Sequence, residues 1–499
     1  MLEKLAKQTA VYGVSTIVVR FLSYLLTPFY TRVFGQETYG IVTDVYALIP
    51  FALVVLTMGL ESAYFRFAGH ADSQAAAEGG TPSEIAAHAG AAKRRLFATT
   101  WGVTLLAASL FFLLVALGRD WVSSWMGEAY AAHPEYVVWV AAIVWFDVAA
   151  CIPFSRLREQ GRATTFVGIK ALSVVVNVAL AFGFGFAGLY DTSFGVGWVF
   201  VANFIASVLT LCVILLTTDR AVPHIDRRLL AALMVYSLPL LVSGVAGTAN
   251  EFIDRQMIKY LVPVDAMAQL GIYGAITKIA VVMVLFTQMY RLAAEPFFLA
   301  DYKKSDFVAM NAAALKYYVM ASMFIFLGIA LFKDLFALIV GADFREGIFI
   351  LPVVLGANVL SGVWLNLSFW YKREERTQLA MWVTFTGLFF TVVMNVALVP
   401  TMGYAGAAWA RLASEAAMVA VSWWLNRRCF PTPYDWRRIG EYVVLGLGAF
   451  FVSAVFARCV PLRGAEYVVN VLLFALFALY AVRRERIDAG RLLRSIVKR

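Results

Sequence analysis

The chain has 499 residues, of which 62% are hydrophobic and only 15% are charged, and its mean hydropathy is +0.76. Soluble globular proteins contain about 45–50% apolar and about 25% charged residues, so this composition excludes a soluble enzyme, a disordered chain and a disulfide scaffold. The formal charge of +10 comes from lysines and arginines between apolar blocks. Membrane topology explains this charge, and we expect no nucleic-acid partner.

The apolar residues form blocks that are long enough to cross a membrane. A helix rises about 1.5 Å per residue, so about 20 apolar residues span a hydrocarbon core of about 30 Å. We therefore predict an all-α polytopic membrane protein with 14 transmembrane helices. These helices are expected near residues 9–32, 40–65, 96–117, 136–155, 164–187, 195–217, 230–252, 269–290, 312–331, 348–369, 378–399, 405–425, 440–457 and 466–482.

Lysines and arginines set the predicted orientation, because the cytoplasmic segments of membrane proteins are enriched in them. With the N-terminus inside, the inner segments hold 28 of these residues and the outer segments hold 8. Arg255 and Lys259 belong to the outer set, in the connection after the seventh helix. The sequence thus predicts two cytoplasmic termini and a multi-pass protein of the bacterial cytoplasmic (inner) membrane.

Three short matches in the same order indicate an internal repeat. The matching pairs are residues 177–180 with 395–398, the loops that begin at Phe154 and Phe369, and residues 39–41 with 270–272. A unit with an even number of crossings repeats in parallel, a plan found in transporters that rock two lobes around a central site. We predict two parallel six-helix lobes, residues 1–218 and 219–430, followed by a helix pair and a basic cytoplasmic tail, residues 431–499.

The opening of the chain is similar to that of a known family. The stretch TAVYGVSTIVVRFLSYLLTPFYTRVFGQETYGIVTDVYALIPFALVVLTMGLESAYFRF, which begins at Thr9, resembles the start of Wzx-like polysaccharide flippases. These proteins belong to the multidrug/oligosaccharidyl-lipid/polysaccharide (MOP) exporter superfamily. The 6+6+2 layout agrees with the resemblance, and so does the NVAL-type stretch before the turn that begins at Gly403.

The resemblance implies a MATE-like (MOP) fold and a transporter rather than an enzyme. Its cargo would be undecaprenyl-pyrophosphate-linked oligosaccharide (an O-antigen, capsule or exopolysaccharide repeat unit), moved from the inner to the outer leaflet by alternating access. No cofactor is implied, and a H⁺ or Na⁺ gradient or the membrane potential is the candidate driving force. Candidate partners are membrane lipids, the polysaccharide polymerase and the chain-length machinery.

Cationic side chains inside or beside the spans are the candidate binding residues for the pyrophosphate or the sugar. An arginine at mid-bilayer costs about 2.5–3.5 kcal/mol on insertion scales, so it is expected to face a cavity or a partner. Arg20 in the first helix and Lys278 in the eighth are such residues. Arg291 and Arg255 lie near helix ends, where a positive-inside flank and an interfacial anchor are the alternatives. For Arg20 the alternative is a structural pair with Asp44.

Intramembrane carboxylates are candidates for ion coupling or for lining the cavity. Asp44 in the second helix and Asp147 in the fourth are the two candidates, and for Asp147 a bond to a neighbouring helix is the alternative. Arg411 and Glu415 stand four residues apart on the twelfth helix, a spacing that places both on one face, and we expect a structural pair. The spacing of cysteines and histidines indicates no metal site.

Three other functions stay open. A lipid II flippase would use the same machine, but several cavity arginines are expected there, whereas the second helix carries Asp44 and Glu61. A cation-coupled multidrug antiporter of the same superfamily usually has 12 helices, without a terminal pair. A membrane glycan polymerase generally presents large outer loops, which are not predicted here.

Overall fold

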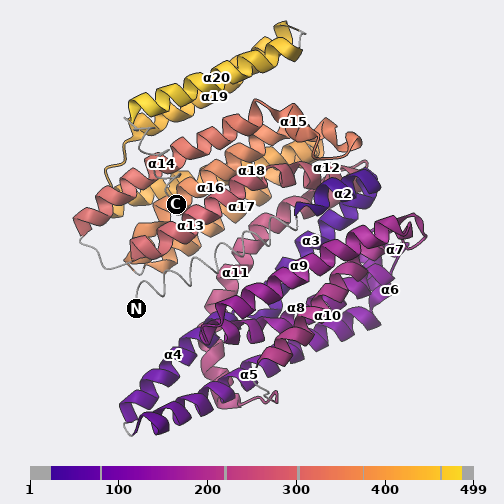
Figure 1. Cartoon of the computed structure of the whole chain (residues 1–499), viewed down its shortest axis with the longest axis vertical. Helices are drawn as coiled ribbons and strands as arrows, with labels where there is room; N and C mark the ends of the chain where they lie inside the picture. Colours follow the sequence, from indigo (N-terminus) through magenta and orange to yellow (C-terminus); the bar gives the residue numbers. More distant parts are fainter. Residues whose placement is uncertain are drawn as a thin grey trace. The chain divides into compact units, whose positions relative to one another are not determined.

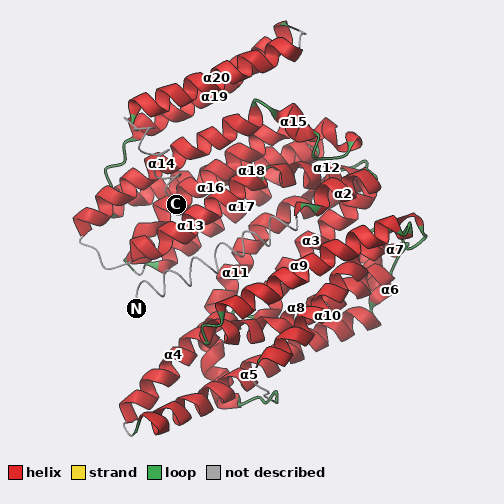
Figure 2. Ribbon diagram, viewed as in Figure 1, coloured by secondary structure: helices red, strands yellow, loops and turns green. Residues whose placement is uncertain are grey.

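The computed structural model describes residues 24–78, 81–218, 222–299, 304–374, 376–460 and 463–485. Within these ranges the regular secondary structure is helical throughout (Figure 2). The chain divides into two compact units, Met1–Gly271 and Ile272–Arg499, and each is described by itself. The predicted all-α fold class is confirmed for the described residues.

The first unit is built around α8. Its residues Ile143, Val148 and Ile152 have no exposed surface, as expected of a helix that is apolar on all sides. α8 packs against α3, α4, α5 and α10. The elements of this unit, coloured indigo to pink in Figure 1, are α2 (Leu26–Val33), α3 (Gln36–Thr57), α4 (Leu60–Glu78), α5 (Pro82–Leu117), α6 (Arg119–Met126), α7 (Glu128–Ala131), α8 (Glu135–Glu159), α9 (Ala163–Phe186), η1 (Leu189–Asp191), α10 (Gly197–Thr217) and α11 (Arg227–Leu261).

The second unit has α16 at its centre, where Leu351, Leu355 and Leu367 are fully buried. α16 packs against α13, α14, α17 and α18. The helix α12 (Ala266–Ile279) crosses from the first unit into this one. The remaining elements are α13 (Val281–Leu299), α14 (Lys304–Ala330), α15 (Lys333–Ala337), η2 (Ala342–Ile350), α16 (Leu351–Arg373), α17 (Thr377–Met402), α18 (Tyr404–Cys429), α19 (Trp436–Cys459) and α20 (Arg463–Arg484).

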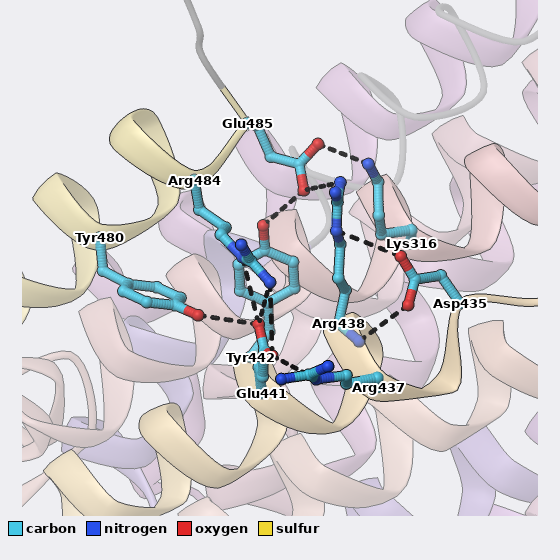
Figure 3. Close-up of polar contacts among 9 residues, drawn as sticks. All are labelled: Lys316, Asp435, Arg437, Arg438, Glu441, Tyr442, Tyr480, Arg484 and Glu485. Atoms are coloured by element: carbon cyan, nitrogen blue, oxygen red, sulfur yellow. Dashed lines mark hydrogen bonds and ion pairs between the residues drawn. The ribbon is translucent and has the colours of Figure 1, made fainter.

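The last two helices, α19 and α20, pack against α14. At one end the buried amide of Asn470 donates to the carbonyl oxygen of Leu331 at 2.7 Å. At the other end the Glu485 carboxylate receives hydrogen bonds from Lys316 of α14 and from Tyr442 and Arg438 of α19 (Figure 3). The predicted C-terminal pair is therefore a fixed part of the second unit.

Among the described residues, eleven helices are long and apolar enough to span a membrane, or twelve if α12 and α13 form one bent span. This finding shows a multi-pass membrane protein. The first predicted helix, residues 9–32, lies mostly outside the described residues. α18 occupies the place of the twelfth predicted helix, although it is not among these apolar spans. The count of 14 and the positions of the termini stay predictions.

Several predicted helices differ from those of the structure. The second, expected as one helix over 40–65, is α3 followed by α4, which continues to Glu78. The third was expected to begin near residue 96, but α5 begins at Pro82. The seventh helix was expected to end near residue 252, but α11 continues to Leu261, because its last polar turns find partners inside the protein. The eighth, expected as one span over 269–290, is two helices that meet at Ala280 with a bend of 51°.

Candidate functional site

A buried carboxylate, Asp44, joins three helices of the first unit. It lies on α3 and is only 1% exposed. Lys259 of α11 places its Nζ 2.6 Å from Oδ2 of Asp44, and the Gln256 amide donates to Oδ1 at 2.6 Å. The Tyr130 hydroxyl of α7 donates to Oδ2 at 2.8 Å. Both carboxylate oxygens are therefore hydrogen-bonded, as buried charge requires.

The extension of α11 supplies two of these donors. Gln256 and Lys259 are three residues apart, so they share one face of the helix. The ammonium of Lys259 also lies 4.7 Å from the centre of the Tyr130 ring and 5.3 Å from that of Tyr260, a favourable arrangement for a cation. Its side chain is only 6% exposed, so both members of the Asp44–Lys259 pair are withdrawn from solvent.

Tyr130 is a hydrogen-bond donor in this cluster. Burial, and then the negative charge of Asp44, raise the pKa of the Tyr130 hydroxyl well above its ordinary value of 10. The phenol therefore keeps its proton at neutral pH and donates a hydrogen bond to the carboxylate. We define the Asp44 cluster as Asp44, Tyr130, Gln256 and Lys259.

A pocket of about 450 Å³ adjoins the Asp44 cluster. Tyr130 and Lys259 form part of its wall, and three further carboxylates, Glu37, Glu128 and Asp265, line it as well. Lys259 is the single basic residue among its lining residues and is already paired with Asp44. Carboxylates accept hydrogen bonds from hydroxyl groups but repel anions. The pocket therefore suits a polyhydroxyl group or a cation better than a phosphate.

Gly40 allows the start of α12 to pack closely against α3, the helix that carries Asp44. It lies one turn before Asp44 on α3, so both residues share a face. A Cβ atom at Gly40 would lie 2.0 Å from the carbonyl oxygen of Met267, which also lines the pocket. The close backbone contact thus fixes the α11–α12 connection beside the Asp44 cluster.

Lys278 lies at the break of the bent span. It is half-buried in the last turn of α12, two residues before Ala280, where α13 begins its new direction. The C-terminal end of a helix carries a partial negative charge that favours a cation. Interrupted helices with such ends form substrate and ion sites in transporters. Lys278 was expected in the middle of the eighth span, and the structure interrupts the helix of that span near this position.

Two other candidate cations lie on different helices. Arg291 is exposed on α13, and Arg255 is half-buried on α11, one residue before Gln256. Arg20 lies outside the described residues, and so does its expected pair with Asp44. The binding roles of Arg20, Lys278, Arg291 and Arg255 stay predictions.

Asp147 and Glu415 each bond to a neighbouring helix. The Ser207 hydroxyl of α10 donates to Oδ1 of Asp147 at 2.8 Å, which is the inter-helix bond that the sequence left as the alternative. The Trp364 indole of α16 donates to Oε2 of Glu415 at 2.9 Å. Arg411 stands one turn before Glu415 on α18, and their pairing stays a prediction, as does ion coupling at Asp147.

Three members of the Asp44 cluster, Lys259, Gln256 and Tyr130, were not predicted from the sequence. Lys259 was expected in an outer connection, where a lysine is common. One signal was available, because Glu251, Arg255 and Lys259 repeat every four residues, a spacing typical of a continuing helix. Nothing in the local sequence singles out Tyr130, which reaches Asp44 from 86 residues away.

Comparison with known proteins gives one family and a group of solved structures. The family profile described as "Polysaccharide biosynthesis protein" matches residues 5–299. A search of curated protein sequences finds no match. Among solved structures, the chain is similar to the lipid II flippase MurJ in an inward closed conformation, with 11% identity, 96% of this chain and 100% of that chain covered, and a TM-score of 0.66.

Two multidrug transporters are similar as well. An inward-facing MATE family transporter of the MOP superfamily has 16% identity, with 88% of this chain and 98% of that chain covered, and a TM-score of 0.63. The MATE transporter DinF-BH has 14% identity, with 86% and 95% covered, and a TM-score of 0.60. At such identities the likeness shows the fold, which is that of MOP superfamily transporters, as the sequence resemblance predicted.

Proposed function

The chain belongs to the polysaccharide biosynthesis protein family, and from this premise we propose that it is a flippase for lipid-linked oligosaccharide. The cargo is an undecaprenyl-pyrophosphate-linked repeat unit of O-antigen, capsule or exopolysaccharide. The protein moves it from the inner to the outer leaflet of the bacterial cytoplasmic membrane by alternating access. The resident partners are membrane lipids, with the polymerase and chain-length machinery acting after it.

The observation that carries the proposal is the buried Asp44–Lys259 pair beside an acidic pocket. Ionisable residues inside membrane proteins are costly and mark substrate or ion pathways. The predicted repeats assign α3 to the first half of the chain and α11 to the second. When this ion pair is formed, it holds α3 and α11 together and closes the path of the cargo. When the two charges separate and become hydrated, that path opens.

The chemistry of the candidate residues suits the parts of such a cargo. The carboxylates of the pocket, Glu37, Glu128 and Asp265, can accept hydrogen bonds from sugar hydroxyls. The pyrophosphate needs cations, for which Lys278 at the helix break and Arg20 are the candidates. Arginine suits this role because its planar fork matches phosphate oxygens. The polyprenyl tail needs no site, since it stays in the lipid.

A translocation assay tests the proposal. Proteoliposomes or spheroplasts receive a fluorescent polyprenyl-pyrophosphate glycan, and the label that reaches the opposite leaflet is measured against protein-free membranes. We expect Arg20→Ala to reduce transport at unchanged membrane level. Arg32→Ala is the matched control, because Arg32 is exposed at the end of α2. Normal transport by Arg20→Ala would assign Arg20 to structure.

The same assay separates the rival cargoes. Lipid II is the natural rival, because one similar structure is named a lipid II flippase. A labelled lipid II that moves faster than the oligosaccharide would favour that rival, and a soluble cationic dye that moves alone would favour a multidrug antiporter. The α19–α20 pair supports the first two cargoes, since antiporters of this superfamily usually lack it.

A further inference from the structure

A second pocket, of about 960 Å³, lies in the second unit. It is formed by α16, the C-terminal end of α18, the linker 430–435 and the first residue of α19. Leu360, Val419 and Ala420 give it an apolar wall, and Trp423, Tyr434 and Trp436 bring aromatic rings. Its volume is within the range of about 300–1,000 Å³ that ligand pockets occupy.

The linker that closes this pocket is held in place. Phe430 stacks on the buried ring of Trp370, with 5.5 Å between the ring centres. The Asn426 amide donates to the Thr432 hydroxyl at 3.1 Å. The Asn311 amide of α14 donates to the Tyr434 hydroxyl at 2.9 Å. The pocket is therefore preformed, so a ligand does not have to order the linker when it binds.

One charged residue, Arg427, lines the pocket. Its guanidinium lies over the Trp423 ring, 4.9 Å from the ring centre, a cation–π contact that holds the group beside the pocket wall. In the part of the chain that the structure describes, no carboxylate pairs with Arg427. Arg427 is exposed, so its N–H donors can reach an anion, and guanidinium groups bind phosphate oxygens in a fork.

The surroundings favour a lipid over a soluble anion. The pocket combines an apolar wall with two tryptophans, residues that favour the membrane–water interface. It lies beside Arg428, Arg437 and Arg438, in a segment that the charge count assigns to the cytoplasmic side. The cytoplasmic leaflet carries anionic lipids that attract such basic segments.

We propose that this pocket binds one anionic phospholipid of the inner leaflet. Arg427 holds the headgroup phosphate, and an acyl chain lies along Leu360 and Val419. Trp423 and Trp436 pack around the glycerol region. The site is independent of the transported cargo, so it does not rest on the proposed function.

Native mass spectrometry of the full chain in detergent tests the proposal. The protein is titrated with phosphatidylglycerol, with phosphatidylcholine and with inorganic phosphate. We expect phosphatidylglycerol to bind more tightly than phosphatidylcholine, and millimolar phosphate not to displace it. We expect Arg427→Gln to weaken phosphatidylglycerol binding about tenfold, which corresponds to about 1.4 kcal/mol.

Arg428 is a matched control within the same turn. Its guanidinium lies over the Trp424 ring at 4.6 Å, the same arrangement as Arg427 over Trp423, but Arg428 does not line the pocket. We expect Arg428→Gln to leave binding within twofold of the wild type. We expect Trp436→Ala to weaken binding although the charge is unchanged.

Three results would overturn the proposal. Equal losses in Arg427→Gln and Arg428→Gln would show diffuse attraction by the basic segment. Equal affinity for the two phospholipids would show that the headgroup charge is not recognised. Displacement of the lipid by inorganic phosphate would show a soluble-anion site.

Discussion

Gly40 of α3 and Gly271 of α12 make reciprocal contacts, because each glycine faces a backbone carbonyl group of the other helix. A Cβ atom at Gly40 would lie 2.0 Å from the carbonyl oxygen of Met267, and one at Gly271 would lie 2.0 Å from that of Gln36. Met267 stands one helical turn before Gly271 on α12, and Gln36 stands one helical turn before Gly40 at the start of α3. The two helices therefore cross backbone to backbone, at the glycines of the predicted 39–41 and 270–272 repeat.

We predict that Gly40→Ala and Gly271→Ala each destabilise this crossing by about 1–3 kcal/mol, the usual cost of overpacking. The new methyl group would meet backbone atoms, which cannot move aside as a flexible side chain can. Thermal unfolding of the purified protein in detergent measures the effect. Gly69→Ala on α4 is the control, because no atom lies within 4 Å of a Cβ at that position; a loss of stability as large there would refute the steric explanation.

The Asp44–Lys259 pair gives a second prediction. Removing one member of a buried ion pair leaves an uncompensated charge and costs about 3–5 kcal/mol. We expect Asp44→Asn and Lys259→Met each to lower the unfolding temperature strongly. We expect the double variant Asp44→Asn/Lys259→Met to be more stable than either single variant.

A double-mutant cycle on unfolding free energies measures this coupling. Asp120→Asn is the control, because the pair of Asp120 with Arg119 has side chains that are 78% and 58% exposed, and exposed pairs contribute about 0–1 kcal/mol. Additive losses for Asp44 and Lys259 would mean that the two charges act on stability independently.

The sequence predicted much of the fold because the signals for membrane helices are local. The long apolar runs placed α3, α5 and α8–α10, and the short 39–41 and 270–272 match identified two glycines that meet in space. An apolar run is a property of one helix and can be recognised without knowledge of its tertiary contacts, and each of the two matching segments is only three residues long. The resemblance of the opening stretch also predicted the fold that the similar solved structures share.

The Asp44 cluster could not be predicted from local sequence patterns, because its members come from distant parts of the chain. Whether α11 ends at 252 or at Leu261 depends on whether Gln256 and Lys259 find a partner, and that partner is more than 200 residues away. The environment of Glu485, which was assigned to a basic tail, also depends on distant residues. Glu485 is buried because Lys316, 169 residues earlier, and two residues of α19 surround it.

Glu485 gives a third prediction, on pH. Its burial raises the pKa, but hydrogen bonds from Lys316 and Tyr442, and the positive charges of Lys316 and Arg438, outweigh burial and lower the pKa below 4.5. The contribution of the carboxylate to stability is therefore fully present above about pH 4.5. It is lost as the pH falls through the lower value in the folded protein.

We expect Glu485→Gln to lower stability by about 1.5–3 kcal/mol, the range for hydrogen bonds to charged groups, and to flatten the loss of stability as the pH falls below about 4.5. Unfolding curves at several pH values, with limited proteolysis of the α19–α20 pair, measure both effects. Glu441→Gln is the comparison, because Glu441 accepts the same kinds of bond, from Tyr480 and Arg484, but its side chain is 25% exposed (Figure 3), so we expect smaller effects there. An unchanged pH profile in Glu485→Gln would contradict the prediction.

The last prediction concerns ion coupling at Asp147. Asparagine keeps the oxygen that accepts the Ser207 hydrogen bond but removes the charge and the proton site. We expect Asp147→Asn to fold with an unchanged unfolding temperature and to lose the stimulation of transport by an imposed H⁺ or Na⁺ gradient. Ser207→Ala makes the opposite change, since it removes the bond and keeps the carboxylate. It should cost about 1 kcal/mol of stability and still respond to the gradient. If Asp147→Asn responds to both gradients like the wild type, the carboxylate serves only to join α8 to α10.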